Sequence, residues 1–166
     1  MKIQYHANAR IPSLTANSLQ IMKMCAAFAG LGHNVTLIVP RFDRLLPPIS
    51  ELERQYGVTS GFHIRWLRGW RLLGRRVYEA RALSRTRRSA ADLYFTRNER
   101  LAARLARARH TVVLEVHQPP RKVRDVRALR ALTRHASRCT IVVISGALRR
   151  ILLPQFPELS NPRVVV

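Results

Sequence analysis

Short β-branched runs alternate with helical patterns along the whole chain, and this alternation leaves few folds open to it. The predicted strands are residues 2–6, 34–40, 62–68, 92–96, 111–116 and 140–145, with one more beginning at 163–166. The predicted helices are residues 15–32, 50–57, 71–89, 98–109, 123–136 and 146–153. Because strand and helix follow each other in turn, we expect an α/β, Rossmann-like, doubly wound fold, in which helices cover both faces of a mainly parallel sheet.

Length and composition favour one ordinary globular domain, residues 1–166. A chain of 166 residues of which 47% are hydrophobic can bury a real core. The N-terminus lacks the apolar stretch of a signal peptide, and no apolar run reaches the roughly 20 residues needed to cross a bilayer. The two cysteines, Cys25 and Cys139, have no disulfide-framework spacing. We therefore expect reduced core thiols in a cytoplasmic protein.

The formal net charge of +21 indicates an anionic partner. Nearly all of this charge is arginine, since lysine occurs only at Lys2, Lys23 and Lys122. A coding bias toward arginine would explain arginine in place of lysine, but it would not explain why acidic residues are so few. A field this positive attracts phosphates, and nucleic acid, an anionic membrane surface and a sugar nucleotide all fit it.

The predicted helix at 71–88 is rich in arginine. Four of its basic residues can share one side: Arg71, Arg75, Arg85 and Arg88. Trp66 and Trp70 lie at its start. Two interpretations stay open, a solvated outer face over an apolar core stripe, or a surface that touches anionic lipid headgroups. No helix-turn-helix, zinc-finger or RNP-like motif accompanies it, so a nucleic-acid reader is not favoured.

The carboxyl ends of the predicted strands are where a ligand is expected in an open α/β sheet. The loops at that edge are 7–14, 97–98, 117–122 and 145–146. His117 ends the apolar run 111–116, and Pro119 and Pro120 forbid continuation of the strand. The pattern fits a side chain presented at the rim of a sheet, and it equally fits a plain strand end.

The loop after the first strand contains no glycine, although a dinucleotide-binding fold would place glycines there. Its polar residues could still bind a polar or anionic ligand at the helix N-terminus: Asn8, Arg10, Ser13, Asn17 and Ser18. The alternative is that Ser13, Thr15 and Asn17 only cap the helix.

Motifs of several enzyme classes are missing from the sequence. It has no Walker loop, no Cys/His cluster at metal-ligand spacing and no D-x-D pair that would hold a metal-bound diphosphate. The histidines other than His117 have ordinary structural interpretations: His6, His33, His63, His110 and His135.

Four stretches, in this order, resemble the N-terminal domain of GT-B glycosyltransferases, and among these the retaining enzymes of family 4. They are SLTANSLQIMKMCAAFAGLGHNVTLIVP, DLYFTRNERLAARLA, VVLEVHQPP and IVVISGALRRILL. Each stretch is degenerate by itself, while their order and spacing are more specific, and the likeness covers essentially the whole chain.

The resemblance implies a two-domain enzyme that transfers a sugar from a nucleotide sugar to an acceptor, without a metal, between two Rossmann-like halves. It implies that the N-terminal half contacts the acceptor and that His117 lies near the donor sugar and supports the transition state. Arg97 and Arg121 would engage phosphate or an anionic acceptor, and Ser145 is a weaker candidate. No cofactor is expected besides the nucleotide sugar, which is a co-substrate.

This sequence departs from the family's pattern in two places. The first loop lacks the glycine that many relatives place against the donor phosphates. The sequence also ends at NPRVVV, so the donor-side basic pair and the paired glutamates of the E-x7-E type have no counterpart. We therefore expect that the C-terminal donor-binding domain is absent and that the chain as given holds about half an active site, which fits a fragment, a truncated reading frame or a protein completed by a separate C-terminal half.

We expect a glycosyltransferase N-terminal domain at residues 1–166, cytoplasmic and peripheral at the inner membrane face. A lipid-linked or polysaccharide precursor would fit as its acceptor. Two alternatives stay open. One is a non-catalytic basic α/β module for anionic membrane lipid or nucleic acid. The other is a pseudo-enzyme that binds another chain where a C-terminal domain would dock.

Overall fold

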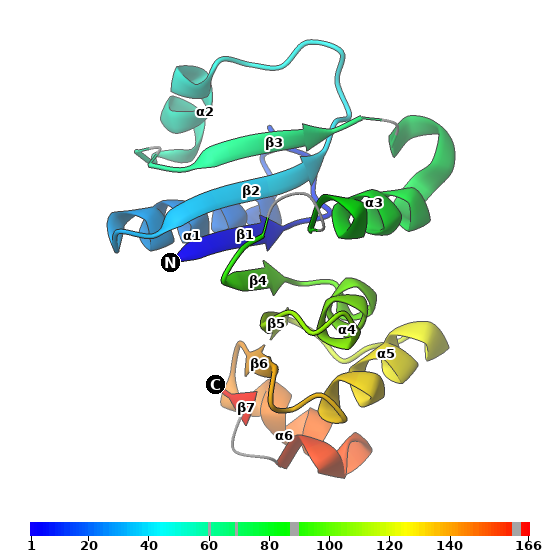
Figure 1. The fold of residues 1–166 in the computed structure, drawn as a ribbon. Coiled ribbons are helices and arrows are strands. Elements are labelled where there is room, and N and C mark those ends of the chain that lie inside the picture. The colour runs from blue at the N-terminus through cyan, green and yellow to red at the C-terminus, as the bar shows by residue number, and fades with distance from the viewer. Residues whose placement is uncertain (60, 69, 87–89, 161–163) are drawn as a thin grey trace. The chain divides into compact units, whose positions relative to one another are not determined.

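The structure is a computed structural model that describes residues 1–59, 61–68, 70–86, 90–160 and 164–166. The described chain forms two compact units, Met1–Asp92 and Leu93–Val166. Each unit has its own parallel strands and its own helices (Figure 1).

The described residues of the first unit form three strands and three helices. They are β1 (Lys2–His6), α1 (Ala16–Gly30), β2 (Asn34–Pro40), α2 (Ile49–Tyr56), β3 (His63–Leu67) and α3 (Trp70–Thr86). The strands pair in parallel in the order β3-β2-β1, with Ile3 beside Val35 and Thr36 beside His63.

Strand β2 is the centre of this first sheet and is covered on both faces. Successive side chains of a strand point to opposite faces. Leu37, Ile38 and Val39 are consecutive, and each is at most 1% exposed. The strand contacts both α1 and α3. The near-continuous apolar run at 34–40 is therefore the sequence pattern of a strand buried between two layers of helices.

Two of the polar side chains buried in the first unit, Tyr78 and His6, make hydrogen bonds within it. The Tyr78 hydroxyl of α3 donates to the carbonyl oxygen of Ile38 at 3.1 Å, and burial is the main cause that raises the pKa of this hydroxyl. Nε2 of His6 lies 3.2 Å from Oε1 of Gln4. Burial lowers the pKa of His6 to about 3, so the imidazole is neutral at physiological pH and its Nε2–H donates to Gln4.

In the second unit, the part of the chain that the structure describes forms four strands and three α-helices. They are β4 (Leu93–Thr96), α4 (Glu99–Arg107), β5 (Val112–Val116), α5 (Val123–Thr133), β6 (Cys139–Val143), α6 (Gly146–Gln155), the 3₁₀ turn η1 (Pro157–Ser160) and β7 (Val164–Val165). The strands pair in parallel in the order β4-β5-β6-β7. Helices α4 and α5 pack against each other.

The predicted α/β fold with parallel strands is confirmed. Each predicted strand and helix is present, and the ends differ from the predicted ones by at most three residues. Helix α6 was predicted to end at residue 153 and instead runs through Pro154. Phe156 N–H bonds to the Leu152 carbonyl at 2.9 Å, so the turn closes past the proline at the cost of one backbone hydrogen bond. The turn η1 was not predicted.

The two cysteines lie in the cores of their units. Cys25 and Cys139 are both buried, and no disulfide joins them within the described residues. Burial raises the pKa of the Cys139 thiol to about 12. No helix in the part of the chain described here combines the length and the apolar character that crossing a membrane requires.

Candidate functional site

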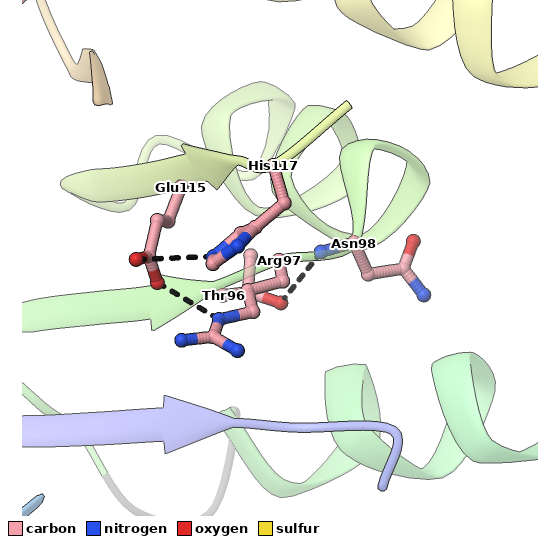
Figure 2. A network of polar contacts seen from close by, with 5 residues as sticks. All are labelled: Thr96, Arg97, Asn98, Glu115 and His117. Atoms are coloured by element: carbon pink, nitrogen blue, oxygen red, sulfur yellow. Dashed lines mark hydrogen bonds and ion pairs between the residues drawn. The ribbon is translucent and has the colours of Figure 1, made fainter. Parts of the chain in front are cut away.

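Strand β5 delivers an acid and an imidazole at its carboxyl end (Figure 2). Residues two apart on a strand point to the same face. Glu115 is the fourth residue of β5, and His117 follows directly after its last residue, Val116. Pro119 and Pro120 follow after Gln118 and cannot extend the ladder. Strand periodicity and the two prolines together set the positions of Glu115 and His117.

Strand β4 brings Arg97 to the same carboxylate. The parallel register pairs Thr96 with Leu114, so the next residue, Arg97, lies beside Glu115. Arg97 Nε donates to Glu115 Oε2 at 2.8 Å. The other carboxylate oxygen, Oε1, lies 3.1 Å from Nε2 of His117. We call Arg97, Glu115 and His117 the Glu115 network.

The three members of the Glu115 network differ in their exposure to solvent. The exposed fraction of the side chain is 4% for Glu115, 14% for Arg97 and 29% for His117. A carboxylate as buried as Glu115 requires a charged or hydrogen-bonding partner, and the guanidinium of Arg97 is always charged. His117 is the most exposed member. It is therefore the side chain of the three that is most accessible to a ligand.

The contact between His117 and Glu115 is an ion-pair contact whose geometry is not that of a hydrogen bond. Nε2 is buried and lies within ion-pair distance of the carboxylate, but the two groups are not aligned for a hydrogen bond. The attraction is therefore strongest when the imidazole is protonated. Because Nε2 is buried, the exposed surface of His117 belongs to the rest of its side chain.

Two buried polar side chains fix the turn that carries Arg97. Thr96 Oγ1 accepts from the Asn98 N–H at 3.2 Å. Asn98 Oδ1 in turn accepts from the N–H groups of Arg100 and Leu101, at 3.0 and 3.1 Å, and so caps α4. The backbone of Arg97 is thus held between a strand end and a helix cap (Figure 2).

The loop after β1 is tied down by hydrogen bonds within the first unit. The Tyr56 hydroxyl of α2 accepts from Ser13 N–H at 2.7 Å and donates to the Ser13 carbonyl at 3.0 Å. Ser18 Oγ also donates to that carbonyl, at 2.7 Å. Thr15 caps α1, because its side chain accepts from Ser18 N–H at 3.3 Å. The polar atoms of Ser13 and Ser18 therefore serve the fold, and ligand binding by these two residues stays a prediction.

The other predicted residues of this loop face solvent. Asn8 and Asn17 are exposed. Arg10 is exposed as well and pairs with Asp43 at 2.8 Å, which links the loops after β1 and β2. Ligand binding by Asn8, Arg10 and Asn17 also stays a prediction, and these three side chains can meet a ligand from solvent.

The two remaining predicted residues lie outside the Glu115 network. Arg121 is exposed in the segment between β5 and α5. Ser145 caps α6, where its Oγ accepts from Leu148 N–H at 3.2 Å. Arg121 is therefore open to an anionic ligand, whereas the Ser145 hydroxyl already has a structural role.

The predicted basic surface of helix 71–88 falls mostly outside the described side chains. The side chains of Trp70, Arg71 and Arg75 are not described, and Arg88 lies outside the described residues. Arg85 is exposed on α3. The two interpretations of this helix both stay predictions.

A solved structure shares the fold of nearly the whole chain. Over 99% of its length the chain is similar to the apo structure of UGT2 from Phytolacca americana, with a TM-score of 0.55 and 10% sequence identity. The fold is glycosyltransferase-like. The match covers 50% of that protein's chain, so this chain spans about half the length of the protein it resembles. No protein-family model and no curated protein match the sequence. Membership of family 4 in particular stays a prediction.

The sequence predicts His117 and Arg97 as site residues but gives no role to Glu115, which contacts both of them. Glu115 was placed inside the apolar run 111–116 without a role. The available signal was its position, because an acid within a buried strand needs a partner and residue 117 shares its face. The contact with Arg97 depends on the register of β4 against β5, which the sequence does not give.

Proposed function

We propose that this chain is the acceptor-side half of a glycosyltransferase that moves a sugar from a nucleotide sugar to an acceptor without a metal, and that His117 is its catalytic residue. The observation that carries the proposal is the Glu115 network at the carboxyl ends of β4 and β5, within a glycosyltransferase-like fold. Ligands of open α/β sheets bind at that edge.

The chemistry asked of His117 is modest and suits an imidazole. Positive charge develops at the anomeric carbon as the bond to the donor's leaving group breaks, and a side chain that hydrogen-bonds the sugar there stabilises the transition state. Glu115 holds the ring from its buried side. The network thus positions His117 while part of its side chain stays exposed to solvent.

The two cationic residues Arg97 and Arg121 have different roles in this proposal. Arg97 is engaged by Glu115, so its role in this proposal is to hold the network. Arg121 is exposed and is the better candidate for a phosphate or an anionic acceptor. The nucleotide sugar is a co-substrate, and in this proposal a C-terminal half beyond these 166 residues would supply most of its binding surface. We place the protein in the cytoplasm, peripheral at the inner membrane face, with a lipid-linked or polysaccharide precursor as acceptor.

The test is a titration of the purified chain with a panel of nucleotide sugars, followed through the NMR signals of the His117 imidazole. At least one nucleotide sugar should shift these signals in a saturable way, while inorganic phosphate at the same ionic strength should not. In an assay of nucleoside diphosphate release, with the partner half added where the chain alone does not turn over, His117→Ala should lower the rate by about 100-fold or more. Its unfolding free energy should change little, because His117 is partly exposed.

The second candidate function is a non-catalytic basic module, which the net charge of +21 favours. A chain whose His117 signals ignore every nucleotide sugar even with the partner half present, and which still binds anionic vesicles or duplex DNA, would support this module and refute the transferase. Salt dependence of that binding would identify it as electrostatic.

A further inference from the structure

Five exposed arginines on α4 and α5 have no acidic partner among the described residues. They are Arg104 and Arg107 of α4, Arg124 and Arg127 of α5, and Arg134 at the end of α5. Ion pairs of the described chain involve other arginines, such as Arg130, which lies 4.0 Å from Glu158. We call these five residues the arginine face.

The two helices that carry the arginine face lie side by side in the second unit. Helix α4 connects β4 to β5, and helix α5 connects β5 to β6. Both crossovers advance the same way along the strand order, and such crossovers are right-handed, so both helices lie on one side of the sheet. The helices contact each other (Figure 1). Each helix buries an apolar stripe, which includes Leu105 of α4 and Leu129 of α5. The arginines therefore occupy the solvent side of a two-helix layer.

The arginine face is electrostatically unbalanced. Residues three apart on a helix are neighbours, so Arg104 and Arg107 repel each other, and so do Arg124 and Arg127. The acidic residues of the two helices do not offset this repulsion at the surface, because Asp125 is buried and Glu99 is half-buried. An anionic partner that neutralises these arginines would relieve the repulsion.

The residue types around the arginine face favour lipid headgroups over nucleic acid. Segments 99–107 and 123–133 contain no aromatic residue for stacking on bases and no Asn or Gln for reading base edges. Val123 is 65% exposed between Lys122 and Arg124, where an apolar side chain has no use against a phosphate backbone. In the interfacial region of a membrane, the same side chain would be removed from water.

We propose that the arginine face of α4 and α5 binds the phosphate headgroups of an anionic membrane surface. This inference does not depend on the proposed transferase activity, because none of the five arginines belongs to the Glu115 network. It also differs from the interpretation of helix 71–88, because it assigns membrane contact to the second unit.

The test is sedimentation of the full chain with vesicles of phosphatidylcholine alone, or of phosphatidylcholine with phosphatidylglycerol, at an ionic strength of about 0.15 M. The chain should sediment with the anionic vesicles only. The triple variant Arg104→Glu, Arg107→Glu, Arg127→Glu should weaken partitioning by on the order of 100-fold. The matched control is Lys23→Glu, Arg54→Glu, Arg65→Glu, which reverses three exposed charges of the first unit and should weaken it far less.

Two further measurements keep the result decisive. If the charge-reversed variant loses its folded circular dichroism spectrum, the same three arginines are replaced by glutamine instead of glutamate. Replacing the same three arginines by lysine, which keeps the charge, should preserve binding. Equal losses in the variant and its control would overturn the arginine face, because net charge alone would then explain binding. Tighter binding to duplex DNA than to anionic vesicles at the same salt would overturn the choice of partner.

Discussion

Two ion pairs of the same length show how burial changes the contribution of a charged residue to stability. Arg97–Glu115 and Arg10–Asp43 both measure 2.8 Å. The exposed fractions of the two side chains are 14% and 4% in the first pair, and 60% and 41% in the second. Water screens the second pair, while the first pair has already lost its hydration. The two pairs therefore form a natural comparison.

We expect Glu115→Gln to lower the unfolding free energy by about 3 kcal/mol, because it leaves the mostly buried Arg97 guanidinium without its carboxylate. Asp43→Asn, the same chemical change at the exposed pair, should cost less than about 1 kcal/mol. Urea denaturation of both variants measures the difference. Equal effects at the two sites would mean that the carboxylate of Glu115 is solvated.

For single residues, the sequence predicts His117 and Arg97 as site residues but does not predict their shared contact with Glu115. Strand alternation and the proline pair are local signals, and they put His117 at the sheet edge. The partner of Glu115 is 18 residues away along the chain. That contact follows from the register of two strands, which local patterns leave open.

The helices of the second unit start in different ways, and this difference is testable. Asn98 caps α4 with two hydrogen bonds to backbone N–H groups. Lys122 stands at the same position of α5 and makes no side-chain cap bond. The stability of α4 should therefore depend on its N-cap residue more than that of α5 does.

We expect Asn98→Ala to lower the unfolding free energy by about 1 kcal/mol, since it leaves the N–H groups of Arg100 and Leu101 without their acceptor. Lys122→Ala is the matched control and should change stability by less than about 0.5 kcal/mol. Chemical denaturation of both variants provides the measurement. A control as destabilised as the variant would contradict the assigned capping role.

Elements were the level at which sequence patterns performed best. Hydrophobic periodicity, caps and glycine stops are local, so each predicted strand and helix was found in the structure. What escaped prediction depends on contacts distant in sequence. The hydroxyl of Tyr56 closes the loop at Ser13 across 43 residues. The continuation of α6 through Pro154 also escaped prediction, and there the Phe156 N–H bonds to the Leu152 carbonyl.

For the molecule as a whole, one buried histidine couples folding to pH. His6 titrates near 6.5 in an unfolded chain, and burial lowers its pKa to about 3 in the folded one. Between these values the unfolded chain binds a proton that the folded chain does not bind. Stability therefore rises with pH across this window and is lost as pH falls from about 6.5 toward about 3. Burial also lowers the pKa of His110, which acts in the same direction.

We expect the unfolding free energy to drop by a few kcal/mol, on the order of 4 at most, over this acid range. Urea denaturation at a series of pH values measures the slope. The variant His6→Gln keeps a polar side chain near Gln4 and removes the titrating group, so its slope should be smaller. An unchanged slope would assign the acid sensitivity to other groups.

The composition of the arginine face limits how a cell could reduce its attraction to anions. Enzymes that acetylate proteins neutralise lysine, and this chain offers them only Lys2, Lys23 and Lys122. Of these, Lys122 alone flanks the five arginines. Guanidinium groups stay protonated at any physiological pH, and methylation leaves their charge in place. Covalent neutralisation therefore has almost no target on this surface, and its attraction to anions can be adjusted chiefly by the surrounding salt or by competing polyanions.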